Sequence, residues 1–360
     1  MLLPIHIAPL MNKNIFRIAL TGGPCAGKTT ALVKIIERFT DRGFLVYALP
    51  ETPTLFMNAS VNFCTEDKTY FYNIEKSILR FQMQMEDTFM QLARTVSQPV
   101  ILISDRGTMD ISAYMDRDMW LAILDEMGVS EVMIRDARYD AVIHMVTAAN
   151  GAAEFYTTEN NSARHENIEL ACQVDEKVLH AWTGHHNLRI VDNDKDFERK
   201  IGNCLAIIAS IVGDQADGAL RRKYLVELVG EIPYGNETEI YEYDLKTDVP
   251  GGIKIRKRGL QGTFVYFITQ RAVSSTTGKS VEVERQISAD EFATYRRQAL
   301  QEKPVIKLRK SFVWKGQSFN VDTFVEPAKD EAILHVVTDN AEETITFPHF
   351  IRVLRELPVD

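Results

Sequence analysis

The stretch GGPCAGKTT at residues 22–30 most constrains what this chain can fold into. Its G-x-x-x-x-G-K-T spacing is the Walker A pattern. A buried-type strand pattern, IFRIAL at residues 15–20, precedes it, and TTALVKIIERF after it has apolar residues at helical spacing. A glycine loop between a strand and a helix lets backbone N–H groups and the helix N-terminus face phosphate groups. The stretch therefore predicts a nucleoside triphosphate site in an α/β domain.

Residues of this loop have separate expected roles in phosphate binding. Lys28 supplies a positive charge for the β- and γ-phosphates, and the Thr29 hydroxyl is a ligand for Mg²⁺. The choice between GTP and ATP stays open, because NDKD at residues 193–196 differs from the Asn-Lys-x-Asp pattern that reads guanine. The predicted nucleotide contacts in the loop are Gly22, Gly23, Pro24, Cys25, Ala26, Gly27, Lys28, Thr29 and Thr30.

Short apolar runs alternate with helical patterns through the first part of the chain. The runs lie at residues 15–20, 44–49, 99–104, 140–146 and 188–191, and the longest helical patterns lie at about 72–96 and 194–213. This alternation is typical of a parallel sheet with helices on both faces. We expect one such nucleotide-binding domain over residues 14–215, after an N-terminal extension of residues 1–13.

Charged residues follow two of these strand-like runs. Glu51 comes after the second run, and Asp105 and Arg106 come after the third. Since the carboxyl ends of parallel strands meet at one crevice, these groups should converge on the phosphates. Asp105 is expected to hold Mg²⁺ and Arg106 to neutralise phosphate charge. Glu51 is a candidate general base, with a solvated loop acid as the alternative.

Three further residues are candidates for the nucleotide site. Arg164 stands near the start of a helical pattern and is a candidate lid arginine, although an ion pair on a helix surface explains it equally well. Asp192 and Asn193 end the last strand-like run, where the base of the nucleotide is expected to bind.

Composition excludes several classes of protein. A net charge of -9 argues against nucleic acid as a partner. No apolar stretch is long enough to span a bilayer, and residues 1–10 lack the basic leader of a signal peptide. The four cysteines form no CxxC pair, as expected of thiols in a reducing compartment. These features favour a cytoplasmic protein and leave peripheral membrane contact open.

Near residue 216, short alternating segments with turn signals replace the helical patterns. They predict an antiparallel sheet or barrel over residues 216–360. Basic residues alternate in KIRKRG and VIKLRK, so each set shares one face of a strand. Inward-facing cations would bind a polyanionic phosphate ligand, whereas outward-facing ones would only be solvated. The candidate ligand-binding residues are Lys223, Lys254, Arg256, Arg258, Arg271, Lys307 and Arg309.

Both halves of the chain resemble known families. Residues 14–213 carry GGPCAGKTT, PET, SDRG, NNSARHE and AWTGHHNLRIVDN in order, and so resemble the P-loop domain of bacterial nicotinamide riboside kinases and insect TRPL translocation defect proteins. Residues 219–350 resemble the CYTH domain, or triphosphate tunnel fold, in KYLVEL, IKIRKRG, EVERQIS, IKLRKSF and FNVDTF. The family signature Glu-x-Glu-x-Lys keeps only Lys223 here, and LHVVT carries none of the carboxylates of the late acidic strand.

The translocation defect proteins join these two domains in this order. The resemblance implies a regulatory protein that binds GTP and phosphoinositide and acts in membrane trafficking. The missing carboxylates imply a barrel that binds a phosphoinositide or inorganic polyphosphate without metal-dependent cleavage. Two alternatives remain open: a small-molecule or nucleoside-type kinase that uses the P-loop domain, and a triphosphatase in the barrel.

Overall fold

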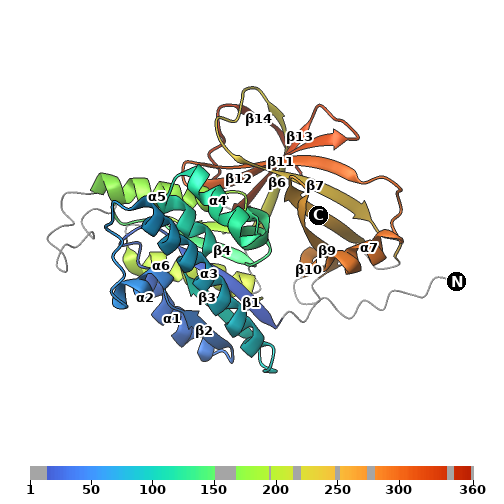
Figure 1. Ribbon diagram of the computed structural model, residues 1–360. Helices are drawn as coiled ribbons and strands as arrows, with labels where there is room; N and C mark the ends of the chain where they lie inside the picture. The colour runs from blue at the N-terminus through green and yellow to red at the C-terminus, as the bar shows by residue number, and fades with distance from the viewer. Residues whose placement is uncertain are drawn as a thin grey trace. The chain divides into compact units, whose positions relative to one another are not determined.

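A computed structural model describes residues 14–150, 168–193, 196–213, 220–247, 252–273, 280–338 and 344–357 (Figure 1). These residues form two compact units, which divide the chain just before Leu220, except that Val313–Ser318 belongs to the first unit. One unit is built on a parallel sheet and the other on an antiparallel sheet. Within the described ranges, no helix has the length and apolar character needed to cross a membrane.

The first unit contains a five-stranded parallel sheet in the order β2-β3-β1-β4-β5. Its central strand runs parallel to both neighbours, with Ile18 beside Ile103 on one side and Ala141 on the other. All five carboxyl ends therefore lie at the same edge of the sheet. The strands are β1 (Ile15–Thr21), β2 (Leu45–Leu49), β3 (Val100–Asp105), β4 (Ala141–Met145) and β5 (Leu188–Val191).

Helices cover both faces of this sheet, as the sequence predicts (Figure 1). One apolar cluster joins the strands to α1 and α6, and a second joins them to α3, η1, α4 and α5. The helical elements are α1 (Lys28–Thr40), α2 (Thr52–Asn58), α3 (Lys68–Ala93), the 3₁₀-helix η1 (Thr108–Tyr114), α4 (Arg117–Met127), the π-helix η2 (Val132–Asp136), α5 (Ile168–Trp182) and α6 (Phe197–Ile211).

The second unit is a nine-stranded antiparallel sheet in the order β10-β9-β8-β7-β11-β12-β13-β6-β14. It confirms the predicted change of architecture in the second half of the chain. The strands are β6 (Leu220–Leu228), β7 (Asn236–Asp244), β8 (Ile253–Leu260), β9 (Thr263–Val273), β10 (Ser280–Ile287), β11 (Val305–Trp314), β12 (Gln317–Glu326), β13 (Ala332–Thr338) and β14 (Ile351–Leu357). The helix α7 (Ala289–Arg296) follows β10.

Strand β8 shows how the pleat divides the faces of this sheet. Ile253 and Ile255 belong to an apolar cluster that contains Phe292 of α7. Since successive side chains point to opposite faces, Lys254, Arg256 and Arg258 lie on the other face. The sheet thus has an apolar face against α7 and a polar face at β8.

Candidate functional site

The loop between β1 and α1 has a backbone that depends on glycine. Gly22 has a φ of 140° and Gly27 a φ of 91°, values that side chains with a Cβ atom rarely adopt. A Cβ atom on Gly22 would also collide with the carbonyl oxygen of Met145. Thr147 fixes the loop from β4, because its Oγ1 donates to the Pro24 carbonyl at 2.5 Å.

Lys28 is the first residue of α1, and its side chain folds back over the loop. Its Nζ donates to the carbonyl oxygens of Gly22 at 3.0 Å and Gly23 at 3.1 Å. Burial lowers the pKa of Lys28, as does the nearby charge of Arg106. The amine is thus already held at the phosphate loop. Thr29, the proposed Mg²⁺ ligand, lies exposed in the first turn of α1.

Arg106 connects the P-loop with two carboxylates. Its Nε donates to Glu51, and its Nη1 lies 3.3 Å from both the Gly22 carbonyl and Asp110 Oδ1. Burial alone would lower the pKa of Arg106, but Tyr114, Asp110 and Glu51 together raise it. Burial would raise the pKa of Glu51, but Arg106, Thr54 and Lys28 together outweigh it and lower that pKa, which favours the carboxylate. Glu51 and Arg106, which follow different strands in the sequence, therefore contact each other as predicted.

Asp110 was not predicted from the sequence, yet it anchors this arrangement. Its carboxylate accepts hydrogen bonds from Thr21 at the end of β1, from the Gly107 amide and from Trp182 Nε1 of α5. The contact with Trp182 is 2.9 Å and is buried. Asp110 thus holds β1, the loop after β3 and α5 together beneath Arg106.

Asp105 ends β3 and has an oxygen, Oδ1, that is buried without a hydrogen-bond partner among the described residues. Burial raises the pKa of Asp105, and the nearby charge of Lys28 offsets only part of this shift. An orphaned carboxylate oxygen beside the P-loop fits a divalent cation. Across the described residues, no three His, Cys, Asp or Glu side chains group as a metal site. A single carboxylate such as that of Asp105 suits Mg²⁺, which commonly takes one or two carboxylates together with substrate phosphates.

A cavity of about 410 Å³ lies beside these groups. Glu51, Arg106 and Asp110 line one part of it, and aromatic and aliphatic side chains supply most of the rest. These apolar walls come from α2, α3, η1 and the segment between α2 and α3. The apolar lining residues are Pro53, Met57, Phe63, Phe71, Ile78 and Ile111.

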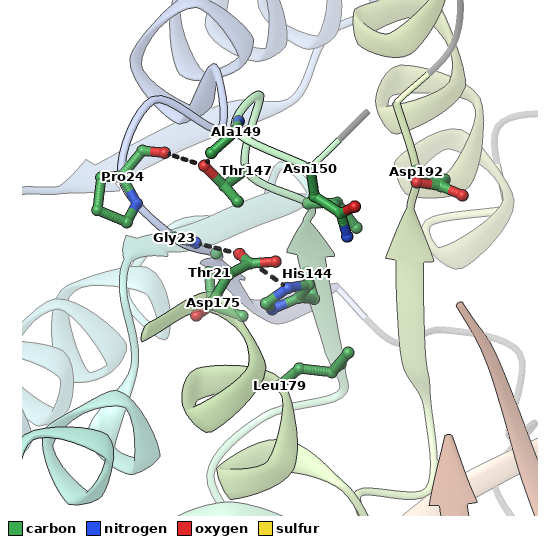
Figure 2. Close-up of polar contacts among 12 residues, drawn as sticks. Thr21, Gly23, Pro24, His144, Thr147, Ala149, Asn150, Asp175, Leu179 and Asp192 are labelled. Carbon is green, nitrogen blue, oxygen red and sulfur yellow. Dashed lines mark hydrogen bonds and ion pairs between the residues drawn. The ribbon is translucent and has the colours of Figure 1, made fainter. Parts of the chain in front are cut away.

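A buried pair of residues supports the P-loop from the other side (Figure 2). Asp175 of α5 accepts a hydrogen bond from the Gly23 amide at 2.6 Å, and His144 Nε2 of β4 lies 3.2 Å from the same oxygen. Burial would raise the pKa of Asp175, but His144 and the amides of Gly23 and Thr147 outweigh it and lower that pKa. The spacing of residues in the sequence gave no sign of this pair.

Asn193 has a supporting position after β5. Its Nδ2 donates to the carbonyls of Thr147 at 2.7 Å and Asn150 at 2.5 Å, and its Oδ1 accepts from Lys200 at 2.8 Å. The Asn193 amide thus orders the loop after β4. Asp192 beside it is exposed, so its role at the base stays a prediction. Arg164, the candidate lid residue, lies outside the described residues.

The polar face of the antiparallel sheet centres on Glu242. Its carboxylate accepts a hydrogen bond from Lys254 at 3.0 Å, and lies 3.5 Å from Arg256 and 3.6 Å from Lys307. Burial would raise the pKa of Glu242, but these three cations outweigh it and lower the pKa to about 2. Cations from β8 and β11 therefore converge on one buried carboxylate of β7.

Two more carboxylates lie among the cations of this face. Glu284 is 3.0 Å from Arg258. Arg309 donates two hydrogen bonds to Asp322, at 2.6 Å and 2.8 Å, and His335 Nε2 lies 3.0 Å from the same carboxylate. Burial lowers the pKa of His335, which favours the neutral ring.

Each of Lys254, Arg256, Arg258, Lys307 and Arg309 therefore has a carboxylate partner, and phosphate binding by these five residues stays a prediction. The positions where the CYTH family carries its signature carboxylates correspond to β6 and β13 of this chain. The acids described here, Glu242, Glu284 and Asp322, come instead from β7, β10 and β12. Lys223 on β6 pairs in register with His335. Arg271 lies in β9, and its side chain is outside what the structure describes.

A parallel sheet with a G-x-x-x-x-G-K-T loop between its central strand and first helix defines a P-loop nucleotide-binding domain. More particularly, this chain belongs to the AAA domain family, whose family model matches residues 17–200. No curated protein matches the chain.

Part of the chain also has distant structural neighbours. The inorganic triphosphatase NE1496 matches with 23% identity and a TM-score of 0.28, over 38% of this chain and 85% of that protein. A second structure, titled as the hypothetical protein NE1496, matches with 23% identity and a TM-score of 0.27, over 38% of this chain and 88% of that protein.

Proposed function

We propose that this protein is a phosphotransferase that moves the γ-phosphoryl group of ATP or GTP to a hydroxyl group of a small molecule. The cavity beside the P-loop carries this proposal, because Glu51 and Arg106 both line it. Arg106 also reaches the Gly22 carbonyl, so the cavity adjoins the phosphate loop. A protein that only sensed a nucleotide would need no apolar chamber at this place.

In this proposal Glu51 is the general base. The substrate hydroxyl bonds to the γ-phosphorus through its oxygen, its proton passes to Glu51, and the bond from that phosphorus to the β–γ bridging oxygen breaks. Lys28 and Arg106 neutralise charge on the transferring group. Thr29 and Asp105 would hold Mg²⁺, which supplies further charge neutralisation at the β- and γ-phosphates. The apolar walls keep water away, which favours an alcohol as the acceptor.

Nucleotide turnover over a panel of nucleosides, nicotinamide riboside and other small alcohols tests the proposal. We expect one class of acceptor to stimulate turnover by the wild-type protein. Glu51→Gln should lower the stimulated rate by about 10²- to 10⁴-fold and keep nucleotide affinity. If no acceptor stimulates turnover, and the wild-type rate equals that of Lys28→Ala, the protein is not a kinase for this panel and a nucleotide-binding regulatory role is favoured.

We propose a second function for the antiparallel unit, the binding of a polyanionic phosphate ligand. Its support is the polar face, where Lys254, Arg256 and Lys307 gather around the carboxylate of Glu242, with Asp244 also beside Lys254 and Glu284 beside Arg256. A multiply charged phosphate could exchange with such carboxylate contacts, because the same donors serve both kinds of oxygen. The ligand would be inorganic polyphosphate or a phosphoinositide headgroup, and the bound nucleotide would regulate its binding. From the sequence resemblance to translocation defect proteins, we extend this proposal to a role in membrane trafficking.

Three measurements separate these forms of the second function. Inorganic tripolyphosphate binding tests the shared chemistry, and vesicles with and without phosphoinositide test the lipid source. Hydrolysis of tripolyphosphate that survives Lys28→Ala but is lost in Lys307→Ala would identify a triphosphatase. Failure to bind either tripolyphosphate or phosphoinositide vesicles would overturn the second function.

A further inference from the structure

Polar side chains at the reacting end of the P-loop cavity are committed to contacts within the protein. Glu51 and Asp110 accept hydrogen bonds from Arg106. Gln82, which also lines the cavity, is used at both ends of its amide. Its Nε2 donates to Glu86 Oε1 at 2.7 Å, and its Oε1 accepts from Thr52. Because both ends of the Gln82 amide are already hydrogen-bonded within the protein, this side chain is not available to bind the substrate.

Glu75 of α3 differs from these side chains. It lines the same cavity and is 5% exposed, yet no hydrogen bond or ion pair joins it to another described residue. Buried carboxyl groups in native proteins are nearly always paired, so an unpaired one requires an explanation. Burial raises its pKa to about 7. Such a group lining a cavity is a candidate for ligand recognition.

Helical geometry places Glu75 away from the reacting end. Gln82 Nε2 lies 3.3 Å from the carbonyl oxygen of Arg106, which marks the level of the catalytic groups along α3. Glu75 precedes Gln82 by two turns of the helix, or roughly 10 Å. Phe71 and Ile78 line the cavity with it, and the phenol of Tyr114, which also lines it, interacts electrostatically with both Arg106 and Glu75. A ligand in this cavity therefore has an apolar middle and meets a carboxyl group at its far end.

We propose that Glu75 selects the acceptor substrate by accepting a hydrogen bond from an N–H group roughly 10 Å from the hydroxyl group to be phosphorylated. This inference rests on the proposed kinase function. It assigns the substrate to compact molecules with a hydroxyl at one end, an apolar or aromatic body, and an amino or amide donor at the other end. Nucleosides with an amino group on the base have this arrangement.

Two matched pairs of nucleosides test the inference. Adenosine and purine riboside differ only in the amino group, as do cytidine and its deamino analogue. Their affinities are measured by calorimetry at pH 8, with a non-hydrolysable triphosphate in excess to fill the P-loop site. We expect the amino member of at least one pair to bind the wild-type protein about tenfold more tightly than its partner. Glu75→Leu should abolish this difference, and Glu75→Gln, whose carbonyl oxygen still accepts, should keep part of it.

Glu126→Gln is the control, because it removes an exposed carboxylate outside the cavity and should leave the discrimination unchanged. Equal affinities within both pairs, discrimination that survives Glu75→Leu, or no binding by any of the four nucleosides at millimolar concentration would overturn the inference. Turnover with a different alcohol would still support the proposed kinase. Glu75-dependent binding without turnover would instead overturn the kinase and leave a recognition site.

Discussion

Glu75 opposes folding whenever its carboxyl group is ionised. Its pKa is about 7 in the folded protein, because burial disfavours the charged form, and 4.5 is the ordinary value. A raised folded-state pKa gives stability that is fully present below about 4.5 and lost as pH rises through about 7. Glu75→Gln should therefore be more stable than wild type at pH 8, by up to about 3 kcal/mol, and nearly equal to it at pH 4.5. Urea denaturation over this pH range measures the difference.

A stability difference that stays constant with pH would contradict the argument. The control Glu126→Gln should show no gain at pH 8, because it removes a carboxylate that accepts hydrogen bonds from Lys76 and Tyr72.

Asp175 is expected to matter through its shape and its acceptor oxygen. Asp175→Ala leaves the buried Gly23 amide without its partner, which should cost about 1–3 kcal/mol of unfolding free energy. Since that amide belongs to the P-loop, nucleotide affinity should fall about tenfold. Asp175→Asn keeps an acceptor at the same place and should recover most of the affinity. Titration with a fluorescent nucleotide analogue measures the nucleotide affinities of both variants. Unchanged affinity in Asp175→Ala would show that the contact does not order the loop.

The proximity of two candidate site residues could be predicted from a local pattern. Glu51 and Arg106 each follow a strand of the parallel sheet, so the fold alone brings them together. Asp110 and Asp175 were missed because their partners are distant in sequence: Trp182 is 72 residues from Asp110, and Gly23 is 152 residues from Asp175. No spacing rule reports such contacts, since they exist only once the helices pack on the sheet.

At the scale of elements, the five parallel strands could be predicted from short apolar runs, and the antiparallel sheet from alternating apolar residues. Strand β14 was missed, because IRVLREL contains charged residues and good helix formers. Pairing with β6 makes it a strand. Helix α7 was also missed, although Ser288 and Glu291 form a capping box at its start. Strand β14 thus depends on pairing that the sequence does not show. Helix α7 was missed because a local signal, its capping box, was overlooked.

The turn from β1 to α1 supports a prediction about backbone shape. Gly22→Ala should abolish nucleotide binding and lower the melting temperature, because the new Cβ atom would collide with the Met145 carbonyl. Gly43→Ala is the matched control, since Gly43 also has a positive φ, of 86°, but its Cβ atom would meet open space. It should cost only about 1 kcal/mol and leave binding intact. Thermal melts and nucleotide titrations compare the two, and equal effects would refute the collision argument.

At the scale of the whole molecule, two differently charged sites lie in separate units of an acidic chain. The net charge of -9 gives no hint of the cations on β8 and β11, because acidic residues elsewhere outnumber them. The side-chain contacts described around Lys28 come from residues 14–213, and those around Lys307 from residues 220–338. Each site can therefore be removed without touching the contacts of the other.

Lys307→Ala should weaken the binding of inorganic tripolyphosphate by about ten- to a hundredfold, since it removes one charge-assisted contact worth about 1.5–3 kcal/mol. The fold should hold, because Glu242 keeps two other cationic partners. Nucleotide affinity should be unchanged, whereas Lys28→Ala should show the reverse pattern. Lys303→Ala is the control, as this lysine is 81% exposed and should affect neither ligand. Calorimetry with each ligand measures all three variants. With each ligand titrated in the absence of the other, loss of both affinities in one variant that stays folded would contradict the assignment of Lys28 and Lys307 to separate sites.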